Sequence, residues 1–199
     1  MALTKAVEQV QDWTQVAQNA VGESAILDCS GHYGTMLCIQ AALDTTTAHA
    51  AGTDFIVQVS SNTSGDEDWH DLLPFNELNG TAATDLVEDN PLAATATSIA
   101  FTGHSLTALG KWLFLKDGSA IADSELVFQV GQSANAVVVL DGTTNAHAQN
   151  TPIFNIAFSR TYILPPEAVR CRLLVNNTKV AAGSTVCYKL RATKITAVI

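Results

Sequence analysis

The fold class is decided by the stretch VRCRLLV, residues 169–175. Its odd-numbered residues are apolar, whereas Arg170 and Arg172 place charge at the positions between them. A period of two puts the apolar side chains on one face of a β-strand and the two arginines on the other. A strand with one apolar and one polar face is typical of an antiparallel sheet that packs a core on one side.

A pattern typical of β-strands extends from Gly22 to the end of the chain. β-branched and aromatic runs alternate with clusters of Gly, Asn, Asp and Thr. We expect strands at 24–29, 35–42, 54–60, 68–73, 98–102, 111–116, 125–130, 136–140, 153–164, 169–176 and 185–196. No alternating helical segments of about ten to fifteen residues are present, which excludes a doubly wound α/β fold. The predicted fold is all-β, an antiparallel β-sandwich of jelly-roll or immunoglobulin-like type.

The N-terminal segment has a different pattern. Apolar residues three or four apart are Leu3, Val7, Val10, Trp13, Ala17 and Ala20. This spacing predicts an amphipathic α-helix that Gly22 ends. Two interpretations stay open, since the helix can pack on the protein's own sheet or dock on a neighbouring subunit.

Residues 91–150 have the features of an insert. They begin after Asn90, pass through the small-residue stretch 93–97, and continue with predicted strands joined by tight turns at 116–118 and 140–142. We predict a small β-barrel-like subdomain at 91–150, inserted into a main sandwich formed by 23–90 and 151–199. The arm 1–22 precedes both. A single sandwich that contains every predicted strand is the alternative.

Two loops share a sequence phrase. Residues 45–53 read TTTAHAAGT and residues 143–151 read TTNAHAQNT, so six of nine positions agree. Each phrase precedes an apolar strand, and the match goes no further, which indicates a reused loop and not a duplicated domain. We expect His49 and His147 to hydrogen-bond loop carbonyl groups, with contact to a ligand as the alternative.

The composition excludes several partners. The chain has 199 residues, with 19 acidic against 10 basic side chains, a net charge of −9 and 47% hydrophobic residues. This balance argues against disorder and against a nucleic-acid partner, because the chain repels phosphate. Apolar runs such as 136–140 are far below the roughly 20 residues of a bilayer span, so we expect no membrane partner. The N-terminal residues lack an apolar signal region, which favours a cytoplasmic protein with free thiols.

Charges are segregated along the chain. Acids gather between residues 66 and 89, and bases between 160 and 194. The interface candidates among them are Asp66, Glu67, Asp68, Asp71, Arg170, Arg172, Lys189 and Arg191. These opposite charges either face each other within one molecule or form a head-to-tail contact between identical copies.

The sequence contains none of the common catalytic, metal-binding or nucleotide-binding motifs. The acidic cluster at 66–71 lacks the spacing and glycine of an EF-hand, and no CxxC, HExxH, GxSxG, P-loop or GxGxxG occurs. We therefore expect no catalytic residue, no metal, no cofactor and no enzyme. A sandwich hydrolase whose two carboxylates meet only on folding stays a rival interpretation.

Three phrases carry a resemblance: GTDFIVQVSS at 52–61, GDEDW at 65–69 and LDGTTNAHA at 140–148. They resemble virion structural proteins of tailed bacteriophages, and among these the head decoration or cement proteins. The resemblance implies a non-enzymatic virion protein that is assembled in the host cytoplasm and stabilises the phage head by bridging neighbouring capsid subunits. The implied partners are the major capsid protein and copies of the chain itself, as a trimer or dimer.

On this interpretation the N-terminal segment docks through Leu3, Val7, Val10 and Trp13. The alternative function is a tail, baseplate or receptor-binding module that binds glycans. That alternative predicts exposed aromatic side chains in a groove near Trp69 or Trp112.

Overall fold

The computed structural model describes residues 3–65, 68–103, 106, 110–118, 120–178 and 184–198. The strands are β1 (Leu3–Val16), β2 (Val21–Glu23), β3 (Leu27–Asp28), β4 (Gly34–Leu43), β5 (Thr53–Ser60), β6 (His70–Glu77), β7 (Thr84–Leu86), β8 (Ser98–Ala100), β9 (Trp112–Leu115), β10 (Glu125–Gln132), β11 (Ala136–Val139), β12 (Pro152–Phe154), β13 (Ala157–Ile163), β14 (Arg170–Asn176) and β15 (Val186–Val198). Within the described residues, one turn of 3₁₀ helix, η1 (Ile121–Asp123), is the sole helical element. No helix in this part of the chain has the length and hydropathy that crossing a membrane requires.

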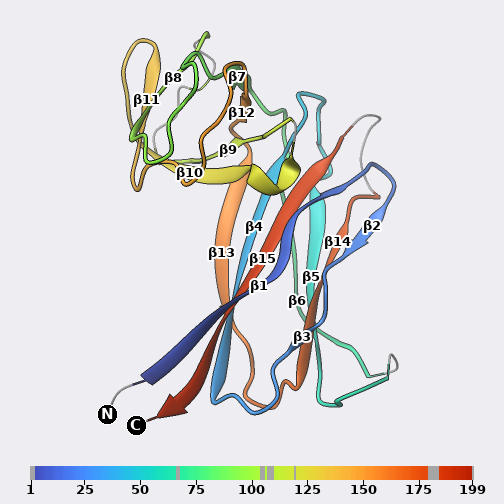
Figure 1. Cartoon of the computed structure of the whole chain (residues 1–199). Helices are drawn as coiled ribbons and strands as arrows, with labels where there is room; N and C mark the ends of the chain where they lie inside the picture. Colours follow the sequence, from blue (N-terminus) through green and yellow to red (C-terminus); the bar gives the residue numbers. More distant parts are fainter. Residues whose placement is uncertain are drawn as a thin grey trace.

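Two antiparallel sheets face each other to form the main body (Figure 1). One has the order β1-β15-β4-β13, and the other has the order β2-β14-β5-β6 with β3 paired to β14. Buried side chains from both sheets, including Leu37, Phe55 and Leu173, form the core between them. The antiparallel all-β fold predicted from residues 169–175 is confirmed, and the finer jelly-roll or immunoglobulin-like type stays a prediction.

A third sheet, with the order β7-β12-β9-β10-β11-β8, curls into a half-barrel beside the sandwich (Figure 1). Its two edge strands approach each other where an isolated antiparallel bridge joins Val87 to Phe101. Ile99, Leu113 and Val137 are among the buried residues of its separate core. Strands β7 and β12 belong to this sheet although they lie outside 91–150; the domain boundaries themselves stay a prediction.

The half-barrel is attached to the sandwich through a buried carboxylate. Asp44, which follows β4, accepts hydrogen bonds from Gln15 at 2.7 Å and from the Cys187 thiol at 3.3 Å. Lys116 reaches the same carboxylate oxygen from the half-barrel at 2.8 Å. This contact covers part of the outer surface of the β1-β15-β4-β13 sheet and leaves the rest of that surface open.

The predicted N-terminal α-helix is wrong, because residues 3–16 form strand β1. The strand carries β-bulges between Thr4 and Lys5, between Gln9 and Gln11, and between Gln11 and Thr14. Each bulge inserts unpaired backbone and moves the next side chain to the other face. Half-buried Val10 and buried Trp13 and Val16 therefore stand three residues apart and imitate a helical period, whereas Val7 is 73% exposed.

Candidate functional site

The open part of the four-stranded sheet presents an ordered set of side chains. In an antiparallel sheet, residues that pair across strands project from the same face. One such row consists of Val7, Thr193, Met36 and Ile163, from β1, β15, β4 and β13. The neighbouring residues Leu37 and Ile39 are buried in the core, so this row points away from the core.

Two further rows complete this surface, which we call the outer sheet face. Its members are Lys5, Val7, Gln9, Met36, Cys38, Thr161, Ile163, Arg191, Thr193 and Ile195. Val7 and Ile163 are 73% and 78% exposed, while Met36 and Ile195 are half-buried. Apolar side chains thus reach the surface from all four strands of one sheet.

The half-barrel sets the limit of the outer sheet face. Farther along the same strands, Ala42 and Cys187 project from this side of the sheet and are fully buried. A cavity of about 90 Å³ lies where the half-barrel begins, and its lining includes Trp13, Lys189 and Arg191. The structure therefore brings together three of the predicted interface residues at this boundary.

The outer sheet face carries positive charge on an acidic protein. Within the described residues, Lys5 and Arg191 form no ion pair. The other nearby cations are neutralised, because Lys189 pairs with Asp12 at 3.0 Å and Lys194 pairs with Glu8 at 2.6 Å. Burial raises the pKa of Asp12, but hydrogen bonds from Lys189 and from the Trp13 backbone lower it by more, so the pKa is below its ordinary value.

One side of this face is a sheet edge. Strand β1 is the terminal strand of its sheet, and the side chains of residues 4–9 are all exposed. The first and last residues that the structure describes, Leu3 and Val198, pair with each other at this end of the molecule (Figure 1). The backbone of Leu3 lies in β1 at this edge, but the structure does not describe its side chain. The predicted interface residues Asp66 and Glu67 lie outside the described residues.

The acidic loop folds back on the basic strand of its own chain. Arg170 donates to the backbone oxygens of Asn62 and Gly65 at 2.6 and 2.7 Å. Arg172 pairs with Glu23 at 2.6 Å, and both guanidinium groups stack over Trp69, at 4.8 and 4.3 Å from its ring centre. These contacts occupy Arg170 and Arg172 within the molecule.

Two acids of this loop, Asp68 and Asp71, also have partners in the same chain. Asp71 accepts a hydrogen bond from the Gln58 amide at 2.7 Å, and Asp68 accepts one from Asn62. Gln58 in turn accepts from Arg172 at 2.8 Å. A head-to-tail contact through these residues stays a prediction.

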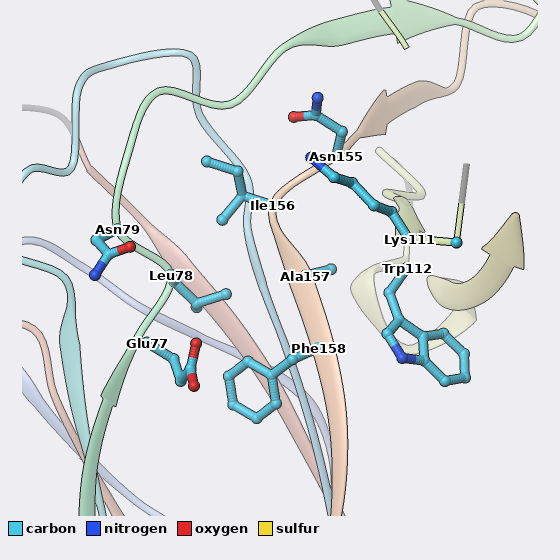
Figure 2. A pocket seen from close by; sticks show the side chains of 10 residues that line it. Glu77, Leu78, Asn79, Lys111, Trp112, Asn155, Ile156, Ala157 and Phe158 are labelled. Atoms are coloured by element: carbon cyan, nitrogen blue, oxygen red, sulfur yellow. The ribbon is translucent and has the colours of Figure 1, made fainter. Parts of the chain in front are cut away.

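A cleft of about 310 Å³ lies between the sandwich and the half-barrel (Figure 2). Glu77, Asn79, Lys111, Trp112 and Asn155 supply its polar and aromatic lining. Trp112 therefore does stand beside a groove, whereas Trp69 is covered by two arginines. Sequence reasoning missed Asn79 and Asn155, because isolated asparagines between strands give the same signal as turn residues.

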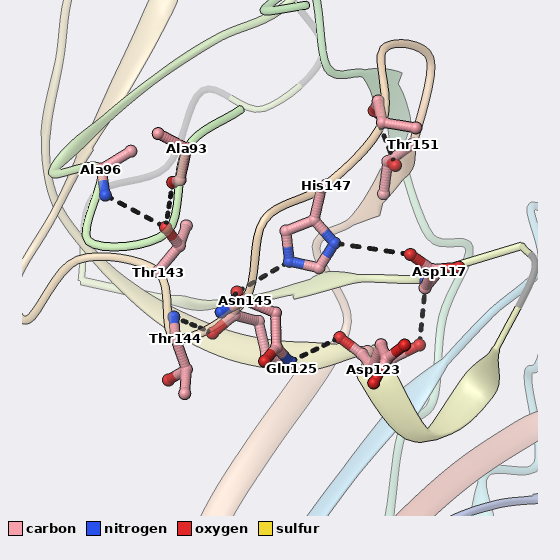
Figure 3. A network of polar contacts seen from close by, with 12 residues as sticks. Ala93, Ala96, Asp117, Asp123, Glu125, Thr143, Thr144, Asn145, His147 and Thr151 are labelled. Carbon is pink, nitrogen blue, oxygen red and sulfur yellow. Dashed lines mark hydrogen bonds and ion pairs between the residues drawn. The ribbon is translucent and has the colours of Figure 1, made fainter. Parts of the chain in front are cut away.

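A buried polar network links the loops of the half-barrel (Figure 3). Glu125 receives hydrogen bonds from the backbone of Thr144 at 2.6 Å and Asn145 at 3.2 Å, and contacts His147 Nε2 at 2.7 Å. Asp117 lies 4.0 Å from the other imidazole nitrogen. His147 is fully buried and this group holds loops together, while Glu125, Thr144 and Asn145 also line the cavity of about 90 Å³ at the boundary of the half-barrel. Among the described residues, no cluster of His, Cys, Asp and Glu suited to a metal ion is found.

No family model matches the chain, and no curated protein matches it. Among solved structures, it is similar to a chain in the structure of infectious bursal disease virus Gt strain, with 10% sequence identity and a TM-score of 0.24, over 96% of this chain and 40% of that one. For a chain of the Gx strain the identity is 7% and the TM-score 0.26, over 98% of this chain and 42% of that one. The protein spans about two fifths of the length of these solved chains. A likeness with such TM-scores decides neither fold nor function.

Proposed function

We propose that the protein is a non-enzymatic structural protein of a virus particle, a head decoration or cement protein of a tailed bacteriophage that bridges neighbouring capsid subunits. The observation that carries this proposal is the outer sheet face. It combines exposed apolar side chains with two cations that form no ion pair within the described part of the chain, on a sheet that ends in an exposed edge.

The chemistry of this face defines its partner. Val7, Met36 and Ile163 supply an apolar centre, and Lys5 and Arg191 add positive charge. A complementary surface on the major capsid protein is apolar at its centre and carries carboxylates at its rim. Repeated around the shell, each contact of about 800 Å² per partner adds buried surface without any chemical step.

Other properties of the molecule support a passive building block. The contact at Asp44 attaches the half-barrel to the sandwich, because half-buried Lys116 of the half-barrel pairs with a buried carboxylate that Gln15 and Cys187 of the sandwich also bind, which favours a stiff body. The hydrogen bonds of Glu125 hold the loops around it together. On this proposal the protein is located in the virion and associates with the capsid and with copies of itself, and it needs no cofactor, nucleic acid or membrane.

The test uses head particles assembled from the major capsid protein alone. The purified protein is mixed with these particles, and bound protein is measured by co-sedimentation. Ile163→Asp places a charge in the apolar centre and is expected to weaken binding by about tenfold or more, because a buried unpaired charge is costly.

The matched control is Leu140→Asp, because Leu140 is 60% exposed but lies beyond the end of β11 in the half-barrel. This variant is expected to bind as the wild type does. Thermal unfolding of both variants shows whether each keeps its fold. Equal binding of Ile163→Asp and wild-type protein would overturn the proposal.

A further inference from the structure

The cleft between the sandwich and the half-barrel has the character of a ligand site. It is formed where β6 ends, where β9 begins and where the link between β12 and β13 passes. We propose that it binds an acidic saccharide, a pyranose ring that carries a carboxylate. This inference is independent of the docking role, because the cleft shares no residue with the outer sheet face.

Size and position fit a sugar. The volume of about 310 Å³ is at the lower end of small-molecule sites, which often form where two structural units meet. Ligands of one or two sugar rings have this scale. Phe158 and Ile156 form an apolar wall between the polar side chains.

Several donors in the cleft have no partner within the described residues. The side chains of Asn79 and Lys111 form no hydrogen bond or ion pair with another described residue. Asn155 accepts the backbone N–H of Ala83 through its Oδ1 atom at 2.8 Å, which fixes the carboxamide and leaves its amide donor for a ligand. Hydroxyl and carboxylate oxygens are the acceptors that such donors suit.

The charge of the cleft favours an anion. Glu77 is neutralised by an ion pair with Arg160. Lys111 is then left as an uncompensated cation in the lining, and a carboxylate on the sugar complements it.

An aromatic ring supplies the apolar surface. Trp112 is half-buried and packs edge-to-face on Phe128, with ring centres 5.1 Å apart, so the indole has a fixed orientation. Figure 2 shows the Lys111 side chain extending toward Asn155, while the Trp112 ring extends the other way. The cleft therefore has a cationic end and an aromatic end, and a sugar ring with one carboxylate matches this arrangement.

The lining points to binding without hydrolysis. Glycosidases place two carboxyl groups on either side of the scissile bond. Among the described lining residues, Glu77 is the one carboxylate, and Arg160 holds it as an ion pair. Within the described lining, no second carboxylate stands opposite it to act as nucleophile or base.

The experiment is an NMR titration of the full chain with sodium glucuronate and with N-acetylneuraminate, and with glucose as the neutral counterpart. We expect the Trp112 indole signal to shift with at least one acidic sugar, with a Kd on the order of 1 mM, and more weakly with glucose. Lys111→Met is expected to weaken binding of the acidic sugar by about fivefold or more and to leave that of glucose unchanged.

Lys5→Met is the matched control, because it removes an exposed lysine outside the cleft and is expected to leave the titration unchanged. Trp112→Leu removes the aromatic surface, and the backbone amide signals of the cleft residues are expected to show no shift with any of the sugars. The proposal is overturned if neither acidic sugar shifts the Trp112 signal, if glucose binds as tightly as glucuronate, or if Lys111→Met binds glucuronate as the wild type does.

Discussion

The loops at 45–53 and 143–151 share a backbone conformation, but the buried histidine of each loop contacts a different kind of side chain. In each, the histidine forms an isolated antiparallel bridge, His49 with Gly80 and His147 with Leu92. Both imidazoles are almost fully buried. His49 contacts the Thr53 hydroxyl at 2.8 Å, whereas His147 contacts the Glu125 carboxylate at 2.7 Å.

The turn after the histidine is also shared. Gly52 and Asn150 occupy equivalent positions, and their φ angles are +66° and +67°. Glycine and asparagine are the residues that adopt this left-handed conformation most readily. The shared phrase therefore encodes a backbone shape. The neutral partner Thr53 lies within the phrase, whereas the charged partner Glu125 comes from β10, 22 residues from His147.

Removal of the charged partner is expected to have the largest effect. Glu125→Ala removes the acceptor of the buried His147 imidazole and of the partly buried backbone N–H groups of Thr144 and Asn145. We expect a loss of about 3–5 kcal/mol in the free energy of unfolding, measured by urea denaturation.

Glu125→Gln is the matched variant, because it keeps an acceptor of the same size and is expected to cost about half as much. Thr53→Val makes the corresponding change in the other loop. It removes a neutral contact with His49 and a hydrogen bond to Asn177, for an expected loss of about 1–2 kcal/mol. If Thr53→Val lowered the free energy of unfolding by more than Glu125→Ala does, the contrast between neutral and charged partners would not hold.

An exchange of the turn residues is expected to have a smaller and asymmetric effect. A Cβ atom at Gly52 would lie 2.9 Å from the backbone oxygen of Glu77 and would collide with the Asn76 side chain. Gly52→Asn is therefore expected to lower the free energy of unfolding by about 1–3 kcal/mol. The reciprocal change Asn150→Gly is expected to alter it by less than about 1 kcal/mol, because the wild type already accommodates a side chain there.

Thermal unfolding of both variants measures this asymmetry. Equal losses in the two variants would show that the turns are energetically alike, and that the crowding at Gly52 relaxes.

The sequence predicted most of the strands but not the partners of their side chains. Alternation at 169–175 identified β14, because a strand with regular pairing keeps its period of two. The bulges of β1 destroyed that period, so Val7, Val10 and Trp13, each three residues apart, suggested a helix. A bulge depends on the pairing with β15, which is distant in the sequence, and no local pattern reveals it.

The same limit applies to the candidate site. Val7 was identified from its spacing in a helix that does not form, yet the structure places it in a row with Met36 and Ile163. This row exists only because four strands share one register. Asn79, Lys111 and Asn155 likewise meet at the cleft through the packing of the two units, and their separation along the chain hides that relation.

Acidification is expected to change the free energy of unfolding by less than the substitutions above. It is also expected to act on the two loops in different pH ranges. Burial lowers the pKa of His49 below its ordinary value of 6.5, although a backbone hydrogen bond with Gly52 opposes this shift. The unfolded state therefore binds a proton first, and the contribution of His49 to stability is lost as the pH falls below 6.5. Burial alone would raise the pKa of Glu125, but hydrogen bonds from His147, Thr144 and Asn145 lower it below its ordinary value of 4.5.

The contribution of Glu125 is therefore complete above pH 4.5 and is lost as the pH falls from there toward its folded-state pKa. Urea unfolding at a series of pH values from about 7.5 to about 3.5 measures both steps. His49→Gln is expected to reduce only the loss of unfolding free energy that begins below pH 6.5. Glu125→Gln is expected to reduce only the loss that begins below pH 4.5. A His49 variant that changes only the step below pH 4.5 would contradict the assignment, because a buried neutral histidine and a buried carboxylate must respond in different pH ranges.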